Sequence, residues 1–460
     1  MQKIWRYGKS FVPLQRSKKH GFSLNMKILC PSPIIGLQKK KEGTAYRLMN
    51  FVVKQEVVEG VLLYNTLTCA LVLVTHEEAQ HLTEVEGLVE NWFLVPVGHN
   101  DKKLCKFVKY GAQMMQKRPN GIRKYTIVTT TGCNARCPYC FEKGTKPVNM
   151  TMETAEKVAQ YIISHRGEYE KVQLDWFGGE PLYNFKVMDR ISTRLVEHHV
   201  EFFSRITTNG FLFSEKMVVK AIQSWHLNSA LITLDGTEQN YNRIKGYIHR
   251  NEPNPFQRVM SNIEMLLKAG IIVTVRLHVG IDNMQDMEEL MRILADKFAG
   301  YGLLSLQILH LFELFGPEAR ILSSEERATL VREIRRLKHY GCQLGIMKPK
   351  ELNQKLKMFR CMVDSEDALM IVPDGHLGLC EHHLEDRFFG HIDNDEWDED
   401  VLKHSREYYG EIPECDTCVL YPTCFRLKIC GLYDICFKEH RDSKILSIQE
   451  QMLSKYQELQ

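Results

Sequence analysis

The sequence contains no apolar run of about 18 residues, the length that a membrane-spanning helix needs. Its start lacks the continuous apolar stretch of a secretory signal, so we expect a cytoplasmic protein with no membrane partner. The net charge is only +3, from 60 basic and 57 acidic residues, and gives no reason to expect nucleic acid binding. The first fifty residues hold one acid against eleven Lys or Arg. This composition predicts a basic, partly ordered arm over 1–45, with an organellar transit peptide as the alternative.

Cysteine, by contrast, is abundant, with fourteen residues in 460. In a chain without a secretory signal, clustered cysteines indicate metal binding rather than disulfides. Three of them lie within 133–140 and seven within 361–436. The remaining four stand alone and are predicted to be small core side chains: Cys30, Cys69, Cys105 and Cys342.

The first cluster has the spacing Cys-x3-Cys-x2-Cys at Cys133, Cys137 and Cys140, directly after an extended run at 125–130. Three thiolates on one loop can hold three irons of a [4Fe–4S] cube and leave the fourth iron open. The alternative is tetrahedral zinc, which prefers Cys-x2-Cys pairs with a fourth Cys or His nearby. We interpret the triplet as an open cluster site.

This triplet resembles the signature of the radical S-adenosylmethionine (SAM) superfamily, in which an aromatic residue precedes the last cysteine. Tyr139 fills that position. The resemblance implies that the reduced cluster cleaves SAM and that the resulting 5′-deoxyadenosyl radical removes hydrogen from an unactivated carbon. It also implies a low-potential electron donor of the flavodoxin or ferredoxin type.

From residue 121 the pattern alternates strand and helix, which is typical of a parallel sheet covered by helices in an α/β fold. Six units are too few for a closed eight-stranded barrel and match the partial (β/α)6 barrel of radical SAM enzymes, whose chemistry lies at the C-terminal ends of the strands. The predicted strands are 125–130, 171–177, 202–207, 229–234, 271–279 and 303–309. The predicted helices are 151–166, 185–199, 214–225, 256–269, 283–298 and 323–340, with N-caps at Thr151, Ser214 and Ser324.

The domains predicted around this barrel, over 121–340, are a small α+β module at 46–120, a cysteine-rich domain at 341–440 and a C-terminal helix at 441–460. The module is expected to contain strands at 46–57, 62–74 and 92–97 and a helix at 76–86. In maturases of ribosomally made peptides a similar segment docks the leader peptide by strand addition. A structural cap on the barrel is the alternative, and both stay open.

The second strand ends in Gly178, Gly179 and Glu180. Glycines let the backbone approach a ligand closely, and the carboxylate can bind an ammonium group. The resemblance implies that this segment binds the amino group of SAM, and that Thr208 and Asn209 after the third strand also contact SAM.

Two further strands end in polar residues. Alternation places Arg276 and His278 on one face of strand five, where Arg276 is expected to hold the SAM carboxylate and His278 is interpreted as structural. Asp235, at the end of strand four, either binds substrate or ribose or caps a turn. The last strand is expected within 306–314.

The second cysteine cluster resembles the SPASM extension, which holds two auxiliary [4Fe–4S] clusters. The spacing departs from that pattern, because five residues instead of three separate Cys424 from Cys430 and Cys436 follows early. The resemblance implies a first set with three thiols, whose fourth ligand is Cys342, a substrate thiol or water, and a second set with four. A zinc ribbon is the alternative. The first set is Cys361, Cys380 and Cys430, and the second is Cys415, Cys418, Cys424 and Cys436.

Glu381 follows Cys380, where sulfatase-maturating relatives carry a catalytic Asp. A carboxylate there could accept the proton that leaves the substrate, whereas the alternative is a surface acid. The leading hypothesis is therefore a radical SAM maturase that oxidatively modifies a precursor peptide. The alternatives are an anaerobic sulfatase maturase and a non-catalytic electron-transfer or zinc-stabilised binding protein.

Overall fold

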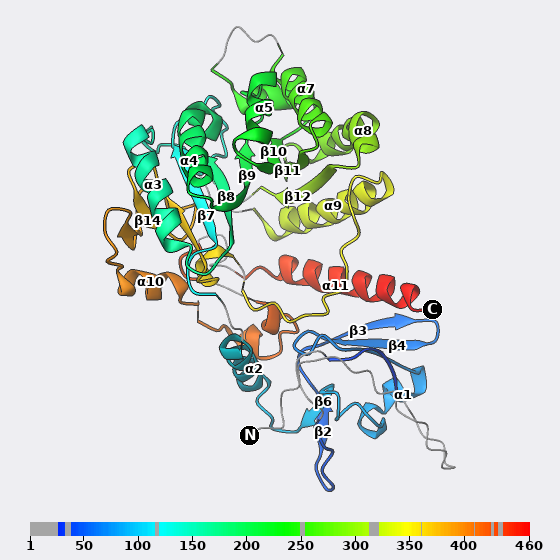
Figure 1. Ribbon diagram of the computed structural model, residues 1–460. Coiled ribbons are helices and arrows are strands. Elements are labelled where there is room, and N and C mark those ends of the chain that lie inside the picture. The colour runs from blue at the N-terminus through cyan, green and yellow to red at the C-terminus, as the bar shows by residue number, and fades with distance from the viewer. Residues whose placement is uncertain are drawn as a thin grey trace.

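The computed structural model describes residues 26–32, 38–115, 119–248, 254–311, 322–359, 361–408, 410–424, 427–430 and 436–460. A helix-covered sheet forms one part of the molecule and a smaller antiparallel sheet forms another, with the C-terminal helix between them (Figure 1). Most of the predicted arm, and the part of the predicted last strand beyond residue 311, lie outside the described residues.

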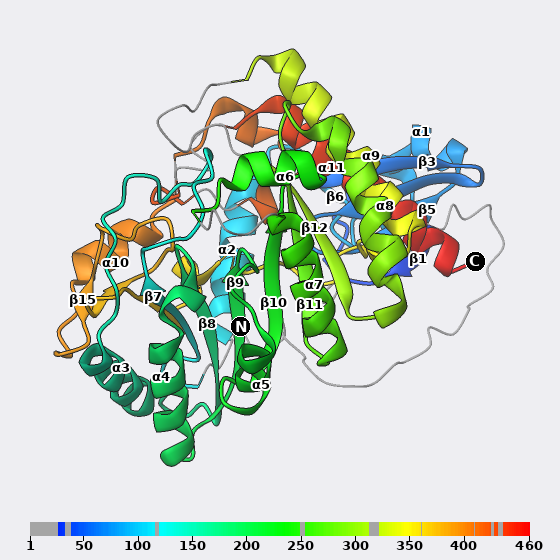
Figure 2. The same cartoon turned by 90° about the horizontal axis from the view of Figure 1, so that it is seen from above.

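The large sheet contains six parallel strands that follow one another in chain order, which confirms the partial (β/α)6 barrel. Seen from above, the strands form a curved wall with helices outside it (Figure 2). The strands are β7 (Lys124–Thr130), β8 (Lys171–Gly178), β9 (Glu201–Thr208), β10 (Leu227–Leu234), β11 (Ile272–Val279) and β12 (Leu304–His310).

Six of the seven helices described in this region are close to their predicted ranges, and the helix Glu238–Lys245 was not predicted. Thr151 and Ser214 cap their helices by accepting bonds from the backbone N–H of Thr154 and Met217. The third cap is Ser323 and not Ser324, because only Ser323 has a glutamate three residues on, Glu326, to complete a capping box. The helices are α3 (Met152–His165), α4 (Phe185–Glu197), α5 (Glu215–Gln223), α6 (Glu238–Lys245), α7 (Pro255–Lys268), α8 (Met287–Phe298) and α9 (Ser324–Gln343).

Strand β11 shows how the barrel separates its two faces. Val273, Val275, Leu277 and Val279 are fully buried in the large core, whereas the alternate residues from Thr274 to His278 are only half-buried. A cavity of about 360 Å³ lies on the half-buried side, and Arg276 lines it. The lumen position predicted for Arg276 follows from this alternation.

Three short strands from the C-terminal part extend the barrel sheet beyond β7. Strand β13 (Ala368–Ile371) pairs in parallel with β7, and β14 (His376–Gly378) and β15 (Gly390–His391) continue the sheet antiparallel. The sequence analysis did not predict these strands. They attach the segment between Cys361 and Cys380 directly to the barrel, and the helix α10 (Glu399–Arg406) follows them.

The N-terminal module is built on an antiparallel sheet of β1 (Lys27–Cys30), β5 (Leu71–Val74), β4 (Gly60–Asn65) and β3 (Val52–Val57) in that order. The expected strand at 62–74 is in fact two strands. The side chain of Asn65 accepts bonds from Leu67 N and Thr68 N, so the chain turns there. The expected strand at 46–57 is likewise divided. The other elements are β2 (Tyr46–Leu48) paired with β6 (Leu94–Pro96), α1 (His76–Gln80) and α2 (Asp101–Met115).

The module shares its hydrophobic core with distant parts of the chain. Leu352 and Leu356 enter it, as do Met452 and Tyr456 of α11 (Lys438–Glu458). Helix α11 packs on both β3 and α9, and Gln449 Nε2 donates to Lys54 O at 2.8 Å. Removing the module would therefore expose apolar residues of the C-terminal part. Among the described helices, none has the length and apolar character to cross a membrane.

Candidate cluster and cofactor site

The three cysteines of the barrel loop follow β7 and are half-buried. The loop is tied to the end of α6, because Arg136 N donates to Lys245 O at 2.8 Å and Ile248 N donates to Asn134 O at 2.9 Å. Burial raises the pKa of Cys133 to about 12 and that of Cys140 to about 11. Thiols in this setting need a bound cation to become thiolates, which is what metal coordination supplies.

The three loop thiols lie close enough to one another to interact electrostatically. Across the described residues, no group of three His, Cys, Asp or Glu side chains is gathered to hold a single metal ion. A cube does not need such a group, because each thiolate binds a different iron.

The two glycines at the end of β8 pack against the cysteine loop. A Cβ on Gly178 would lie 2.1 Å from Thr130 O, and one on Gly179 would lie 2.5 Å from Gly132 O. Gly178 also has φ +135°, which disfavours any side chain. Glu180 N then donates to Gly132 O at 2.9 Å. The segment thus locks Glu180 to the loop that carries the thiols.

Glu180 is fully buried, and its carboxylate accepts hydrogen bonds from neutral groups, while the charge of Lys245 acts on it electrostatically. Thr208 Oγ1 donates to both carboxylate oxygens at 2.7 and 2.9 Å, and Asn209 N donates at 2.8 Å. Burial raises the pKa of Glu180 to about 7 despite these bonds. Within the described ranges Glu180 forms no ion pair, so a cationic ligand such as an ammonium group fits this position.

Thr208 and Asn209, which were both predicted to contact the cofactor, thus donate hydrogen bonds to the carboxylate of Glu180. Asn209 Nδ2 also donates to Asn134 Oδ1 at 2.7 Å, inside the cysteine loop. Asn134 is fully buried and its Nδ2 has no hydrogen-bond partner. An unsatisfied buried amide at a thiol loop is a further sign that a polar group belongs there.

A buried charged network stands beside the loop. Lys245 Nζ lies 2.8 Å from Asp235 Oδ2, and the Tyr139 hydroxyl donates to the same oxygen. Burial alone would raise the pKa of Asp235, but the Lys245 ammonium holds it well below its usual range. His278 Nδ1 lies 3.4 Å from Asp235 Oδ1. Asp235 therefore orients Tyr139, and Lys245 is a residue that the sequence analysis missed.

Arg276 lines the lumen, within electrostatic reach of Glu381. Arg276 Nε donates to Gln307 Oε1 at 2.9 Å, and burial lowers the pKa of Arg276 while the charge of Glu381 opposes this shift. The segment around Glu381 also contacts the loop after the triplet, through the rings of Phe141 and His382 at 4.4 Å. Arg276 interacts electrostatically with Tyr139 as well. The predicted base thus lies near groups of the barrel site.

Glu142, two residues after Cys140, was not singled out from the sequence. Its Oε2 is buried without a hydrogen-bond partner, and burial raises the pKa of Glu142 to about 8. A single glutamate in a Gly- and Lys-rich loop gives no signal that it is buried.

The C-terminal cysteines fall into the two sets that the sequence predicted. In the first, the thiol of Cys380 interacts with Cys361 and Cys430, and burial raises the pKa of Cys380 to about 12. Carboxylates adjoin this set, with Glu381 next in sequence and Asp364 accepting from Cys361 N at 3.0 Å. Cys342, one candidate for a fourth ligand, lies in α9, and burial alone raises the pKa of its thiol. Substrate thiol or water remain as candidates.

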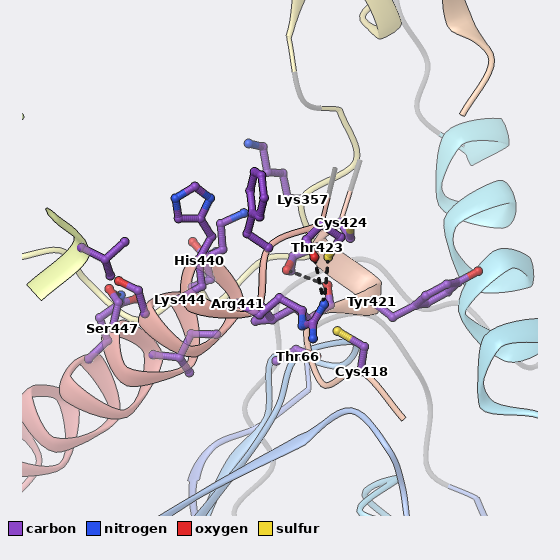
Figure 3. A pocket seen from close by; sticks show the side chains of 18 of the residues that line it. Thr66, Lys357, Cys418, Tyr421, Thr423, Cys424, His440, Arg441, Lys444 and Ser447 are labelled. Atoms are coloured by element: carbon purple, nitrogen blue, oxygen red, sulfur yellow. Dashed lines mark hydrogen bonds between the residues drawn. The ribbon is translucent and has the colours of Figure 1, made fainter. Parts of the chain in front are cut away.

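The second set surrounds one cavity of about 470 Å³ (Figure 3). Arg441 Nη1 donates to Cys436 Sγ at 3.2 Å, and Lys444 acts on Cys424. The thiols that line the cavity are Cys415, Cys418, Cys424 and Cys436, and the cations are Lys338, Lys350, Lys357, Arg441 and Lys444, against the single acid Glu414.

The N-terminal module forms one wall of this cavity. Thr66 Oγ1 donates to Val419 O at 2.6 Å, and Asn50 Nδ2 donates to Asp416 O at 2.7 Å. The rings of Phe51 and Tyr421 stack with centroids 5.9 Å apart. The loop that carries Cys415, Cys418 and Cys424 therefore depends on the module for its position.

Comparison with known proteins agrees with this geometry. Residues 127–294 match the family model described as the radical SAM superfamily. An uncharacterized protein of Methanocaldococcus jannaschii, MJ0907, is 24% identical over 269 residues, which are 57% of this chain and 85% of that protein.

Two solved structures share the fold over more of the chain. That of anSMEcpe with bound AdoMet and Cp18Cys peptide has a TM-score of 0.57 at 16% identity and covers 73% of this chain and 98% of its own. That of Streptococcus suis SuiB bound to precursor peptide SuiA has a TM-score of 0.52 at 14% identity and covers 85% of this chain and 100% of its own. At these identities the likeness is one of fold.

Proposed function

We propose that this chain is a radical SAM enzyme that oxidatively modifies a ribosomally made precursor peptide, by a thioether or a similar cross-link. The observation that carries the proposal is the division of the C-terminal thiols into two sets. One set of three lies near Glu381, and the other set of four lines the cavity of about 470 Å³. Forming a cross-link removes two electrons from the peptide, and buried clusters can accept the second of them.

The extent of the fold likeness supports a peptide substrate. The structure of SuiB bound to precursor peptide SuiA covers 85% of this chain. The anSMEcpe structure, with its bound Cp18Cys peptide, covers 73%. The larger coverage by SuiB favours the peptide maturase as the first hypothesis.

The chain's own residues can hold the cofactors. Cys133, Cys137 and Cys140 would hold the cluster, and Glu180 would bind the SAM ammonium through its buried carboxylate. When bound, the cluster supplies the electron that cleaves SAM to a 5′-deoxyadenosyl radical. Gly178 and Gly179 keep Glu180 against the cysteine loop, and Tyr139 is oriented by Asp235.

Arg276 is proposed to act on the carboxylate of SAM, and Glu381 on the substrate. Arg276 would bind the SAM carboxylate, because a buried guanidinium needs an anionic partner. Glu381 would accept the proton that leaves the substrate. Cys361, Cys380 and Cys430, and the four thiols around the cavity, would hold the auxiliary clusters.

The second candidate is an anaerobic sulfatase maturase that converts Cys or Ser to formylglycine. The TM-score with anSMEcpe, 0.57, supports it. Anaerobic reconstitution with iron and sulfide, followed by SAM, dithionite and a candidate peptide, separates the cases by mass spectrometry. The first proposal predicts 5′-deoxyadenosine and a peptide lighter by two hydrogens. Formylglycine would favour the second candidate, and zinc binding without 5′-deoxyadenosine would favour a non-catalytic protein.

Whether the module at 46–120 docks a leader peptide needs a test with the intact chain. Deleting it would remove the partners of Val419 and Asp416 and would disturb the four-thiol cavity, so loss of activity would be ambiguous. A precursor with a photoreactive residue in its leader gives a cleaner result. Crosslinks within 46–115 would support docking, and crosslinks confined to the barrel would contradict it, with a scrambled leader as control.

A further inference from the structure

The outer face of α2 carries large apolar side chains in solvent. Phe107, Tyr110 and Met114 are 66%, 62% and 71% exposed. Their spacing of three and four residues puts them on one face of the helix. The helix is anchored by a different face, since Cys105 and Val108 are buried in the core of the module. Three exposed apolar residues in one stripe differ from the scattered ones that surfaces normally carry.

One flank of the stripe faces the four-thiol cavity. Lys102 Nζ lies 2.6 Å from Glu411 Oε2, and Lys106 Nζ lies 2.7 Å from Glu411 Oε1. Lys109 interacts electrostatically with Cys424. Figure 1 shows α2 beside the C-terminal segment that carries these groups. A protein bound on α2 would therefore stand next to the second set of thiols.

The charge around the stripe favours an acidic partner. Lys102, Lys103, Lys106 and Lys109 lie within eight residues. The one acid of the helix, Asp101, is buried and paired with Arg47 at 3.0 Å. Glu411 and Asp416 pair with Lys102 and Lys106, and Lys109 interacts with Asp364 and with nearby thiols, so Lys103 supplies the remaining positive charge. The surface keeps a positive excess, which steers an acidic protein toward it.

The size of the stripe fits a transient complex. Aromatic side chains bury about 150–250 Å² each, so three residues exposed by about two thirds offer on the order of 400 Å². A stable interface buries about 800 Å² on each partner, whereas electron-transfer encounters are smaller. The area therefore favours a redox partner over a second copy of the chain.

We propose that Phe107, Tyr110 and Met114, with the lysines beside them, form the docking surface for a small acidic one-electron carrier protein. This inference rests on the proposed function, which provides the auxiliary cluster held by Cys415, Cys418, Cys424 and Cys436. In each encounter one electron passes between the carrier and that cluster, so that one is oxidised as the other is reduced, and no covalent bond forms or breaks.

The test uses the full-length reconstituted protein and a flavodoxin as the probe. The variant carries Phe107→Ser, Tyr110→Ser and Met114→Ser. The matched control carries Val219→Ser and Ile222→Ser on α5, which are 52% and 46% exposed. Binding is measured by calorimetry at two salt concentrations, and oxidation of flavodoxin hydroquinone by stopped flow. Formation of 5′-deoxyadenosine with dithionite, which needs no docking, is measured in parallel.

We expect the α2 variant to weaken flavodoxin binding and slow its oxidation at least about tenfold, as loss of an apolar anchor costs 1.4 kcal/mol or more. The control variant should match the wild type, and salt should weaken wild-type binding. Equal binding by both variants would overturn the proposal. So would a wild-type dimer that the α2 variant dissolves, or leader crosslinks on α2. A failure of peptide modification alone would concern the proposed function, because flavodoxin binding is measured without peptide.

Discussion

The cysteine loop of the barrel and the four cysteines of the C-terminal cavity have opposite electrostatic surroundings. Beside the loop, Glu180 is a buried carboxylate with no ion pair within the described chain, and Lys245 is already committed to Asp235. Around the cavity, Arg441 donates to a thiol and four lysines line the wall. Beside the loop, the Lys245 ammonium is paired with Asp235, so Glu180 can take a cation that a ligand brings, whereas the cavity carries an excess of its own cations. This difference separates a site built for SAM from one built to store an electron.

The strongest test of this contrast removes one thiol from each region. Cys137→Ala should reduce 5′-deoxyadenosine formation from SAM and dithionite to the level of the buffer control, because the loop can no longer hold the cluster. Cys418→Ala should keep measurable nucleoside formation and lose the coupled peptide oxidation. Chromatographic assay of the nucleoside, with iron content as the control for loading, distinguishes them. Nucleoside formation by Cys137→Ala would contradict the assignment.

The next largest effect is expected on SAM affinity when the negative charge of Glu180 is removed. Glu180→Gln keeps the shape and loses the carboxylate, so SAM affinity should fall about 10- to 100-fold, the value of a hydrogen bond to a charged group. Thr208→Val, which only removes a support of Glu180, should weaken binding less. Anaerobic calorimetry measures both. An unchanged affinity in Glu180→Gln would mean that the ammonium binds elsewhere.

The same carboxylate should make SAM binding pH-dependent. Burial raises the pKa of Glu180 to about 7, so the carboxyl is neutral below that pH and ionised above it. Only the ionised form pairs with an ammonium, and affinity should therefore fall about tenfold from pH 8 to pH 6. In Glu180→Gln the profile should be flat over this range. A wild-type profile as flat as that of the variant would rule out Glu180 as the titrating group.

At the cavity, the cation can be removed instead. Arg441→Leu deletes the donor to Cys436 Sγ, and the reduced cluster, which carries more negative charge, loses more stabilisation than the oxidised one. The potential of this cluster should fall by about 60 mV, a tenfold change for one electron. Arg441→Lys keeps a positive charge at this position, so the potential should fall by less than in Arg441→Leu. Redox titration followed by electron paramagnetic resonance gives the value, and a potential that rises or stays constant would contradict the role of Arg441.

The smallest effect concerns the wall of the cavity. Thr66→Val removes the bond to Val419 O and should cost about 1 kcal/mol, or a lowering of the melting temperature by roughly 2 °C. The exposed Ser164→Ala serves as a control outside this contact. Differential scanning calorimetry of the apo-protein measures the shift. Equal melting of the two variants would show that the module does not brace the cysteine loop.

The sequence predicted those parts that depend on short-range patterns. The six strands and the triplet follow from periodicity and spacing. The two sets of C-terminal cysteines follow from the resemblance to the SPASM extension, and the structure brings the members of each set together. Contacts between residues that are distant in the chain could not be predicted from the sequence. Lys245 ends a polar helix, α6, and nothing near it indicates burial, because its partners Asp235 and Tyr139 lie on other elements. Strand β13 is four residues long, too short for a periodic signal.

The module was the least predictable part. It looked like a separate unit in sequence, yet Leu352, Met452 and Tyr456 complete its core from the other end of the chain. Such long-range packing leaves no local pattern. The exposed stripe of α2 was missed for a different reason. A periodic set of apolar residues normally marks a buried face, so the sequence gives no sign that this one is exposed.

The most direct measurement of the central claim is electron–nuclear double resonance on the reduced, reconstituted protein with SAM labelled with ¹⁵N at its amino group. If SAM binds beside this cluster with its ammonium group on Glu180, a ¹⁵N hyperfine coupling should appear and should vanish in Cys137→Ala. A reduced cluster whose spectrum is the same with and without labelled SAM would contradict the assignment of Cys133, Cys137 and Cys140.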